Sequence, residues 1–209
     1  ITDYAGAEAA ALFMLSPDGA LLRCDACVGP VEITGLELAS NQGIVGNSVQ
    51  SDEGVIVRDV AKDPNFHAAV DDETGFKTRS ILCAPMSVKG ERIGAIELIN
   101  KRGGDGLFDD NDLHLLQALA SSAALAVLNA RMAAELVEQE RVKRELELAA
   151  EIQRSLLPAE NIDGDAFPVS GVNVPARVVS GDFYDFYPLD DGRVAFTLGD
   201  VSGKGMNAA

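Results

Sequence analysis

Residues 80–101, SILCAPMSVKGERIGAIELINK, decide the fold of this chain. They hold two apolar runs rich in β-formers, Ser80 to Val88 and Arg92 to Ile99, which the short turn Lys89-Gly90-Glu91 joins. Runs of this length around a glycine-containing turn are typical of an antiparallel β-hairpin. We therefore predict two neighbouring antiparallel strands here.

The residues that precede this hairpin alternate strand, turn and helix signals. Ala9 to Leu15 and Ala20 to Val28 are predicted strands, and the turn Ser16-Pro17-Asp18-Gly19 separates them, with Pro presetting φ and Gly accepting a positive φ. Gly43 to Val49 is predicted to begin a helix, and Gly54 to Val60 to form a β-branched strand. This order indicates an α+β domain.

Two of the three cysteines, Cys24 and Cys27, form a C-x-x-C pair within a predicted strand. At strand periodicity they should point to opposite faces, and no second Cys or His pair completes a zinc tetrad. We interpret them as packing residues of a protein in a reducing cytoplasm rather than as a metal or redox site.

The region 1–108 resembles a GAF domain, the small-molecule-sensing relative of the PAS fold. The resemblance lies in Gly43-Ile44-Val45-Gly46, in the strand and loop from Val57 to Phe66, in Ser80 to Pro85 and in Ile93 to Lys101. It covers nearly the whole region, apart from an absent or truncated first helix. The resemblance implies a sensor domain whose small-molecule ligand or partner the sequence does not identify.

Some cyclic-nucleotide-binding members of that family carry Asn-Lys, then Phe, then Asp-Glu at a set spacing. Asn100, Lys101, Phe108 and Asp112 match this pattern, whereas Leu113 replaces the Glu. The alternative that we favour is a Lys101–Asp112 ion pair that closes the domain without touching a ligand.

The charge balance excludes two classes of partner. The chain has 209 residues and a formal net charge of −16. Binding to nucleic acid needs clustered Lys and Arg, and anionic lipids would repel an acidic surface. Apolar runs such as Ala9 to Leu15 are also far shorter than the roughly 20 residues that span a bilayer. We expect a cytoplasmic protein that binds neither nucleic acid nor membrane.

Residues 109–157 are predicted to form one long helix, because they contain neither Pro nor Gly. Apolar residues follow the 3,4 spacing of a coiled-coil seam, which turns polar between Glu138 and Glu147 and then resumes in a shifted register. The seam consists of Leu113, Leu116, Ala120, Ala123, Val127, Ala130, Ala134 and Val137. We expect a parallel homodimer through this linker; packing of the helix on its own domain accounts equally well for the first half.

The last thirty residues carry two aspartate motifs on two predicted strands. Asp182 follows Ser180-Gly181, Asp200 precedes Val201, and Asp191-Gly192 between them is a strong hairpin signal. An antiparallel hairpin would bring both carboxylates to the same end of a sheet. Hard cations such as Mn²⁺ or Mg²⁺ prefer such oxygen ligands.

These motifs, with the helix end Leu148 to Pro158, closely resemble a known enzyme family, the bacterial stress-response and sporulation branch of the PPM metal-dependent serine/threonine phosphatases. Residues 158–209 would be the truncated start of its α/β sandwich. The resemblance implies two Mn²⁺ or Mg²⁺ ions, with Asp200 bridging them, the Val201 carbonyl as a ligand and Asp182 as a further carboxylate. Asp185 is a weaker candidate. Ser180 departs from the Gly that many members have.

Together the resemblances imply a signal-regulated phosphatase whose substrate would be a phosphoprotein of the anti-anti-sigma type, in sigma factor regulation. The family's remaining metal aspartates would lie beyond Ala209, so we expect little activity from this chain alone. The alternative is a dimeric GAF ligand-binding module with a non-catalytic remnant. A GAF-linked histidine kinase is disfavoured, because the only histidine of the linker is His114, without the expected acidic and proline context.

Overall fold

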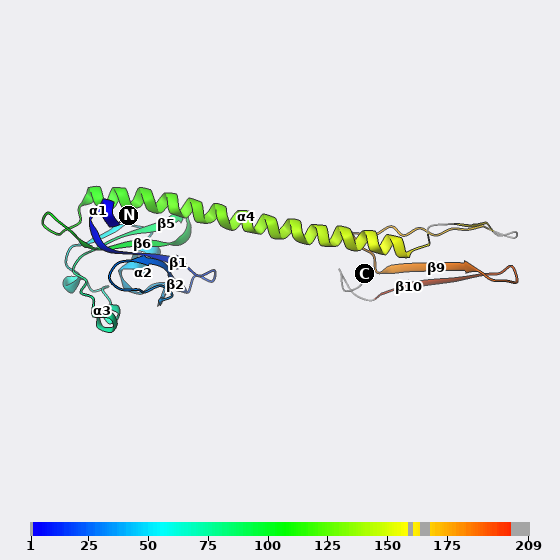
Figure 1. Ribbon diagram of the computed structural model, residues 1–209, viewed down its shortest axis with the longest axis horizontal. Helices are drawn as coiled ribbons and strands as arrows, with labels where there is room; N and C mark the ends of the chain where they lie inside the picture. The colour runs from blue at the N-terminus through cyan, green and yellow to red at the C-terminus, as the bar shows by residue number, and fades with distance from the viewer. Residues whose placement is uncertain (1, 159–160, 164–167, 202–209) are drawn as a thin grey trace. The chain divides into compact units, whose positions relative to one another are not determined.

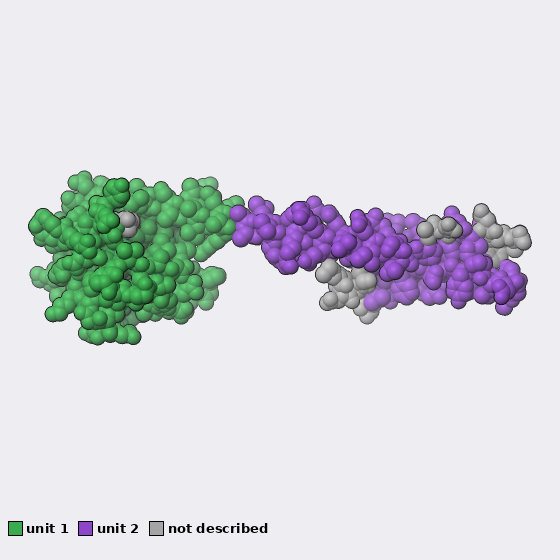
Figure 2. All heavy atoms as spheres, viewed as in Figure 1, with its two compact units in different colours: residues 1–132 green, residues 133–209 purple. Residues whose placement is uncertain are grey.

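The computed structural model describes residues 2–158, 161–163 and 168–201. The chain divides into two compact units, Ile1–Met132 and Ala133–Ala209, which Figure 2 shows in green and purple. Each unit is described separately below.

Unit 1 is built on a six-stranded sheet in which every neighbouring pair of strands is antiparallel. The order across the sheet is β3-β2-β1-β6-β5-β4. The strands are β1 (Ala7–Leu15), β2 (Leu21–Val28), β3 (Glu37–Ala39), β4 (Val55–Val57), β5 (Ile81–Val88) and β6 (Glu91–Lys101). The predicted hairpin is thus confirmed as β5–β6. The strand predicted from Gly54 to Val60 is shorter, because a 3₁₀ turn, η1 (Val60–Lys62), begins at its end.

Helices cover both faces of this sheet, as Figure 1 shows for α2 and the start of α4. The helices of the chain are α1 (Thr2–Ala5), α2 (Gly43–Ser51), α3 (Ala69–Thr74) and α4 (Asp110–Leu156). The alternation of side chains along β1 divides the core in two. Ala10 and Leu12 pack with α4, whereas Ala11 and Phe13 pack with α2.

A single glycine allows β1 and β6 to approach each other at one end. Gly94 pairs with Met14, and a Cβ atom on Gly94 would lie only 2.0 Å from the Phe13 carbonyl oxygen. Any side chain at this position would therefore push the two strands apart.

The prediction that Cys24 and Cys27 point to opposite faces is wrong. The pairing of β1 with β2 shifts between Leu12 and Phe13, so that Phe13 pairs with Cys24 and Ala11 with Cys27. The extra residue in β2 is a β-bulge, which turns Cys27 back to the face of Cys24. Both cysteines consequently lie on the α2 side of the sheet.

The first part of α4 packs against its own domain. Leu116, Ala120 and Ala124 are fully buried in the core formed with β1, β5 and β6. The intramolecular alternative therefore holds for the first half of the predicted seam. Further along, large apolar side chains of α4 are exposed: Met132, Leu136, Val137, Val142, Leu148, Ile152 and Leu156.

Among the described residues, α4 is the one helix whose length and composition would allow it to cross a membrane. This is weak evidence, since helices that pack in protein cores satisfy the same criterion. Leu116 and Ala120 of α4 lie in such a core.

Unit 2 contains the second half of α4 and two short hairpins. These are β7 (Ile162–Asp163) with β8 (Pro168–Val169), and β9 (Asp182–Pro188) with β10 (Val194–Asp200). The Gln153 side-chain amide connects α4 to the segment that precedes β9. Its Nε2 donates to the Ser180 carbonyl oxygen at 2.6 Å, and its Oε1 accepts from the Ser180 N–H at 2.9 Å. The predicted β9–β10 hairpin is confirmed.

Candidate ligand-binding site

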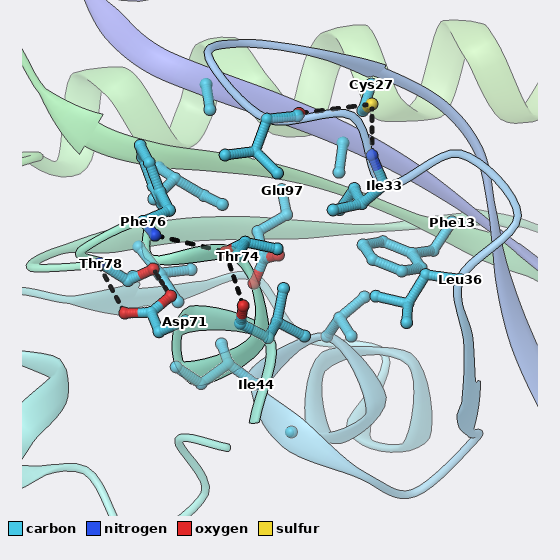
Figure 3. Close-up of a pocket in the computed structure, with 18 of the residues that line it drawn as sticks. Phe13, Cys27, Ile33, Leu36, Ile44, Asp71, Thr74, Phe76, Thr78 and Glu97 are labelled. Atoms are coloured by element: carbon cyan, nitrogen blue, oxygen red, sulfur yellow. Dashed lines mark hydrogen bonds between the residues drawn. The ribbon is translucent and has the colours of Figure 1, made fainter. Parts of the chain in front are cut away.

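A cavity of about 880 Å³, including the space at its mouth, lies on the α2 side of the unit 1 sheet. Its floor comes from β1, β5 and β6, and its walls come from the loop that follows β2, the start of α2 and the segment around α3. Figure 3 shows most of these side chains. Most of them are apolar, including Phe13, Ile33, Leu36, Ile44, Phe66, Val70 and Phe76, and the polar ones include Gln42, His67, Asp71, Thr74, Thr78 and Glu97.

One charged residue, Glu97, rises from the middle of this apolar floor (Figure 3). It lies on the central strand β6, where its register partners are Ala11 of β1 and Cys83 of β5. Both partners are small, which leaves room above the sheet for the longer Glu97 side chain. Glu97 is 9% exposed.

Most of the Glu97 side chain is withdrawn from water, but its carboxyl oxygens keep some contact with solvent in the cavity, since no fully buried side-chain oxygen or nitrogen among the described residues lacks a hydrogen-bond partner. Burial raises the pKa of Glu97 to about 7, because desolvation disfavours the charged form. Among the described residues, no side chain or backbone group hydrogen-bonds to it. A buried polar group without a partner costs free energy that a ligand donor could recover. Glu97 is thus the principal polar anchor that the cavity offers.

The segment 66–78 closes one side of the cavity and is held by its own polar contacts. Asp71 accepts hydrogen bonds from the Thr78 N–H at 2.7 Å and the Thr78 hydroxyl at 2.6 Å. The Thr74 hydroxyl donates to the Val70 carbonyl oxygen and accepts from the Phe76 N–H. These contacts hold α3 in place although none of its residues is buried.

The first turn of α2 lines the cavity with Gly43, Ile44 and Val45. The residue before the helix, Gln42, makes no side-chain cap hydrogen bond. The N–H groups and the partial positive charge of a helix N-terminus favour an acceptor or an anion. The cavity therefore has an acceptor at Glu97 and is bordered by the first turn of α2.

The side chain of Asn100, the first residue of the Asn-Lys motif, makes its hydrogen bonds to other residues of unit 1. Asn100 Oδ1 accepts from the Arg79 and Ser80 N–H groups, and its Nδ2 donates to Glu8 and to the Lys77 carbonyl oxygen. None of these residues lines the cavity.

The Lys101–Asp112 ion pair is confirmed. Lys101 Nζ lies 2.5 Å from Asp112 Oδ1 and 5.7 Å from the centre of the buried Phe108 ring. Neither Lys101 nor Asp112 reaches the cavity. The interpretation of the motif as a closure of the domain therefore agrees with the structure.

The second predicted site is brought together only in part. Asp182 and Asp200 are direct register partners across β9 and β10. The Val201 N–H donates to the Gly181 carbonyl oxygen at 3.0 Å, which makes Asp182 and Asp200 a non-hydrogen-bonded pair, the kind in which side chains lie closest. Both carboxylates are exposed. Like charges placed directly opposite each other destabilise a sheet, so the pair suits a cation.

Other predicted parts of this site are separated or lie outside the described residues. The register of β9 is regular, so Asp185 points to the opposite face from Asp182. The glycine-rich residues 203–205 are not among those described. Within the described part of the chain, no group of three or more Asp, Glu, His or Cys residues could hold a metal ion. Asp182, Asp200 and the Val201 carbonyl thus form at most part of a metal site.

The sequence analysis missed Glu97. Its signal is a single acidic residue in the apolar run Ile93 to Ile99. A charged residue inside a strand that is apolar on both faces is either paired or functional, and this criterion could have identified it.

The sequence matches the GAF domain family over residues 1–127. A probable 3′,5′-cyclic phosphodiesterase of Caenorhabditis elegans is 33% identical over 92 residues, which are 44% of this chain and 12% of that protein. The cGMP-specific 3′,5′-cyclic phosphodiesterase of Drosophila melanogaster is 31% identical over 91 residues, 43% of this chain and 8% of that protein. The chain thus spans about a tenth of the length of these curated relatives.

Solved structures share the fold at low sequence identity. The GAF domain of a phosphoenolpyruvate-protein phosphotransferase from Coxiella burnetii has a TM-score of 0.58 and 20% identity, covering 64% of this chain and 79% of that one. A GAF domain/HD domain protein from Geobacter sulfurreducens has a TM-score of 0.53 and 15% identity, covering 62% and 86%. Since the family match covers more than half of the 209 residues, the chain belongs to the GAF domain family.

Proposed function

We propose that unit 1 is a ligand-binding signalling module and that its ligand occupies the cavity over Glu97. The observation that supports this is Glu97, a residue only 9% exposed, whose carboxyl group has no hydrogen-bond partner among the described residues and lies on the floor of a largely apolar cavity. Pockets for small molecules combine apolar walls with a few polar groups that fix orientation.

The chemistry of the cavity favours a flat ligand with donors at one end and an acceptor or anion at the other. A purine nucleotide has this form, and curated relatives include cGMP-specific phosphodiesterases. In a guanine ring, adjacent N–H donors can pair with both oxygens of one carboxylate. The phosphate would then lie near the start of α2. We therefore propose cGMP as the first ligand to test.

Binding of cGMP would be seen as a rise in the melting temperature of the chain, since a ligand that binds the folded state stabilises it. cAMP is a matched control, because it keeps the ribose and the cyclic phosphate and changes only the donor pattern of the base. If cGMP leaves the melting temperature unchanged, the proposal of a nucleotide ligand is wrong.

The second half of α4 would carry the signal within a homodimer. The support is its exposed apolar side chains, which include Leu136, Leu148 and Ile152. Sedimentation velocity would detect the dimer, and Leu148→Glu with Ile152→Glu should shift the chain towards monomer.

A second candidate function is a PPM-type protein serine/threonine phosphatase in a longer protein that contains this chain. The observation that favours it is the face-to-face pairing of Asp182 with Asp200 behind the Gln153–Ser180 contact. Two Mn²⁺ or Mg²⁺ ions at this site would lower the pKa of a bound water molecule and screen the charge of the phosphoryl oxygens. Within the described residues, Asp182 and Asp200 would supply carboxylate oxygens and the Val201 carbonyl would supply one more ligand.

The test of this second function is Mn²⁺-dependent phosphate release from a phosphoserine protein by the longer protein. Asp200→Asn is the control, because it keeps the shape of the residue and removes its charge. A cytoplasmic location and a phosphoprotein of the anti-anti-sigma type as substrate belong to the same proposal.

A further inference from the structure

The cavity over Glu97 is lined by acidic rather than basic side chains. Glu97 and Asp71 both belong to its lining, together with His67. In the part of the chain that the structure describes, no lysine or arginine lines it. An anionic ligand would therefore find no lysine or arginine there to pair with.

Basic side chains elsewhere in unit 1 are paired with carboxylates outside the cavity. Arg79 Nη2 lies 2.7 Å from Glu8 Oε1, and Lys101 is paired with Asp112. None of these four residues lines the cavity. Their positive charges are thus already balanced within the domain.

A ligand phosphate would gain little affinity in these surroundings. The first turn of α2 borders the cavity, and a solvent-exposed helix N-terminus typically favours an anion by about two- to fivefold in affinity. A phosphate placed deeper, beside apolar side chains and two carboxyl groups, would lose its water without gaining a counter-charge. Recognition must therefore come mainly from the uncharged part of the ligand.

Glu97 is the carboxyl group that is free to recognise such a part. Both carboxyl oxygens of Asp71 already accept hydrogen bonds from Thr78, whereas Glu97 has no hydrogen-bond partner among the described residues. The rings of Phe13 and Phe76 line the same cavity, as Figure 3 shows. Aromatic walls suit a flat ring, and a carboxylate with two free oxygens suits two adjacent N–H donors on the edge of that ring.

We propose that the cavity recognises the guanine base alone, so that an uncharged guanine nucleoside binds about as tightly as cGMP. This inference rests on the proposed function of the cavity and adds the uncharged nucleoside as a class of ligand. The N1–H and 2-amino groups of guanine donate to the two carboxyl oxygens of Glu97. Inosine lacks the 2-amino group, so it would leave one of these oxygens without a partner.

Isothermal titration calorimetry of guanosine, cGMP and inosine against the wild-type chain tests this inference. At pH 8 Glu97, with its pKa of about 7, is mostly ionised. We expect the dissociation constants of guanosine and cGMP to agree within about fivefold and that of inosine to be at least about tenfold higher than that of guanosine. A larger preference for cGMP, or a smaller penalty for inosine, would overturn the proposal.

The same titrations separate this inference from the proposed function on which it rests. Binding of cGMP without binding of guanosine would overturn the inference and leave the cavity as a nucleotide site. Folded protein that binds neither compound would contradict both.

Glu97→Gln tests whether the carboxylate itself reads the base. The amide offers one acceptor and one donor, which match the N1–H and the 2-carbonyl oxygen of xanthosine rather than the two donors of guanosine. The ratio of the two dissociation constants should change by at least about tenfold in favour of xanthosine. Glu91→Gln is the matched control, because it makes the same substitution at the exposed end of β6, outside the cavity, and should keep the wild-type ratio.

An unchanged ratio in Glu97→Gln protein that circular dichroism shows to be folded would overturn the proposal. If this variant does not fold, the comparison of guanosine, cGMP and inosine on the wild-type chain still decides the question.

Discussion

Glu97 and Cys83 lie directly opposite each other on β6 and β5, both buried and both ionisable, in the middle of the GAF sheet. Burial raises the pKa of each, and the carboxylate adds to the rise for the thiol. Because Glu97 also lines the cavity, the protonation of its carboxyl group should affect both the free energy of unfolding and ligand binding.

The stability of the chain should fall as the pH rises. Glu97 has a pKa of about 7 when folded, against 4.5 as its ordinary value. Between these values the folded state holds a proton that the unfolded state has lost, so the favourable contribution is complete below 4.5 and disappears as the pH rises through 7. The free energy of unfolding should decrease by up to about 3 kcal/mol between pH 5 and pH 8.

Urea denaturation at several pH values measures this effect. Glu97→Gln, which cannot ionise, should flatten the profile over this range, and Glu91→Gln on the exposed end of β6 should not. A wild-type profile as flat as that of Glu97→Gln would contradict the assignment of a buried, proton-binding Glu97.

Neutralising Asp112 should cost stability and leave the cavity unchanged. Asn at this position can still accept from the Asp109 N–H, but it removes the ion-pair partner of the half-buried Lys101 ammonium. We expect Asp112→Asn to lower the free energy of unfolding by about 1–2 kcal/mol. If the variant were as stable as wild type but failed to bind the ligand, the Asn-Lys motif would have a role in binding.

The small residues of α4 should tolerate enlargement only on the side that faces solvent. Ala120 is fully buried against the sheet, so Ala120→Leu should destabilise unit 1 by about 1–3 kcal/mol. Ala118 lies on the exposed side of the same helix, and Ala118→Leu should stay within about 0.5 kcal/mol of wild type. Equal effects of the two substitutions, measured by urea denaturation, would mean that α4 does not pack on the sheet in this way.

The continuity of α4 gives a test of signal transmission in the longer protein. Inserting three or four residues near Glu140 rotates everything that follows about the helix axis. If the longer protein is the proposed phosphatase, its phosphatase activity should then change while both domains remain folded. An insertion of seven residues, close to two helical turns, is the matched control and should restore most of the output. Indifference to all three insertions would make α4 a passive tether.

Sequence patterns predicted much of this fold, for reasons that can be traced to particular residues. The β5–β6 hairpin and the length of α4 follow from apolar runs, a turn at Gly90 and the absence of helix breakers. The partner of the helix could not be predicted, because an apolar face such as that of Leu116 and Ala120 suits a sheet as well as a second helix.

The site was less accessible to prediction than the fold. The placement of Cys27 depends on one extra residue in β2, and a bulge has no clear signal in the sequence. The apolar run around Glu97 marks it as an unusual residue, but its place on the cavity floor between the small residues Ala11 and Cys83 follows only from the strand register. The alignment of Asp182 with Asp200, in contrast, was predictable from the Asp191-Gly192 turn.

Isothermal titration calorimetry of cGMP against the wild-type chain and Glu97→Gln, at pH 6 and pH 8, tests the central claim most directly. We predict one site per chain, tighter binding at pH 8 because the ionised carboxylate accepts two hydrogen bonds, and at least about tenfold weaker binding by Glu97→Gln. Absence of binding to folded wild type, or equal binding by the two proteins, would contradict a nucleotide site anchored on Glu97.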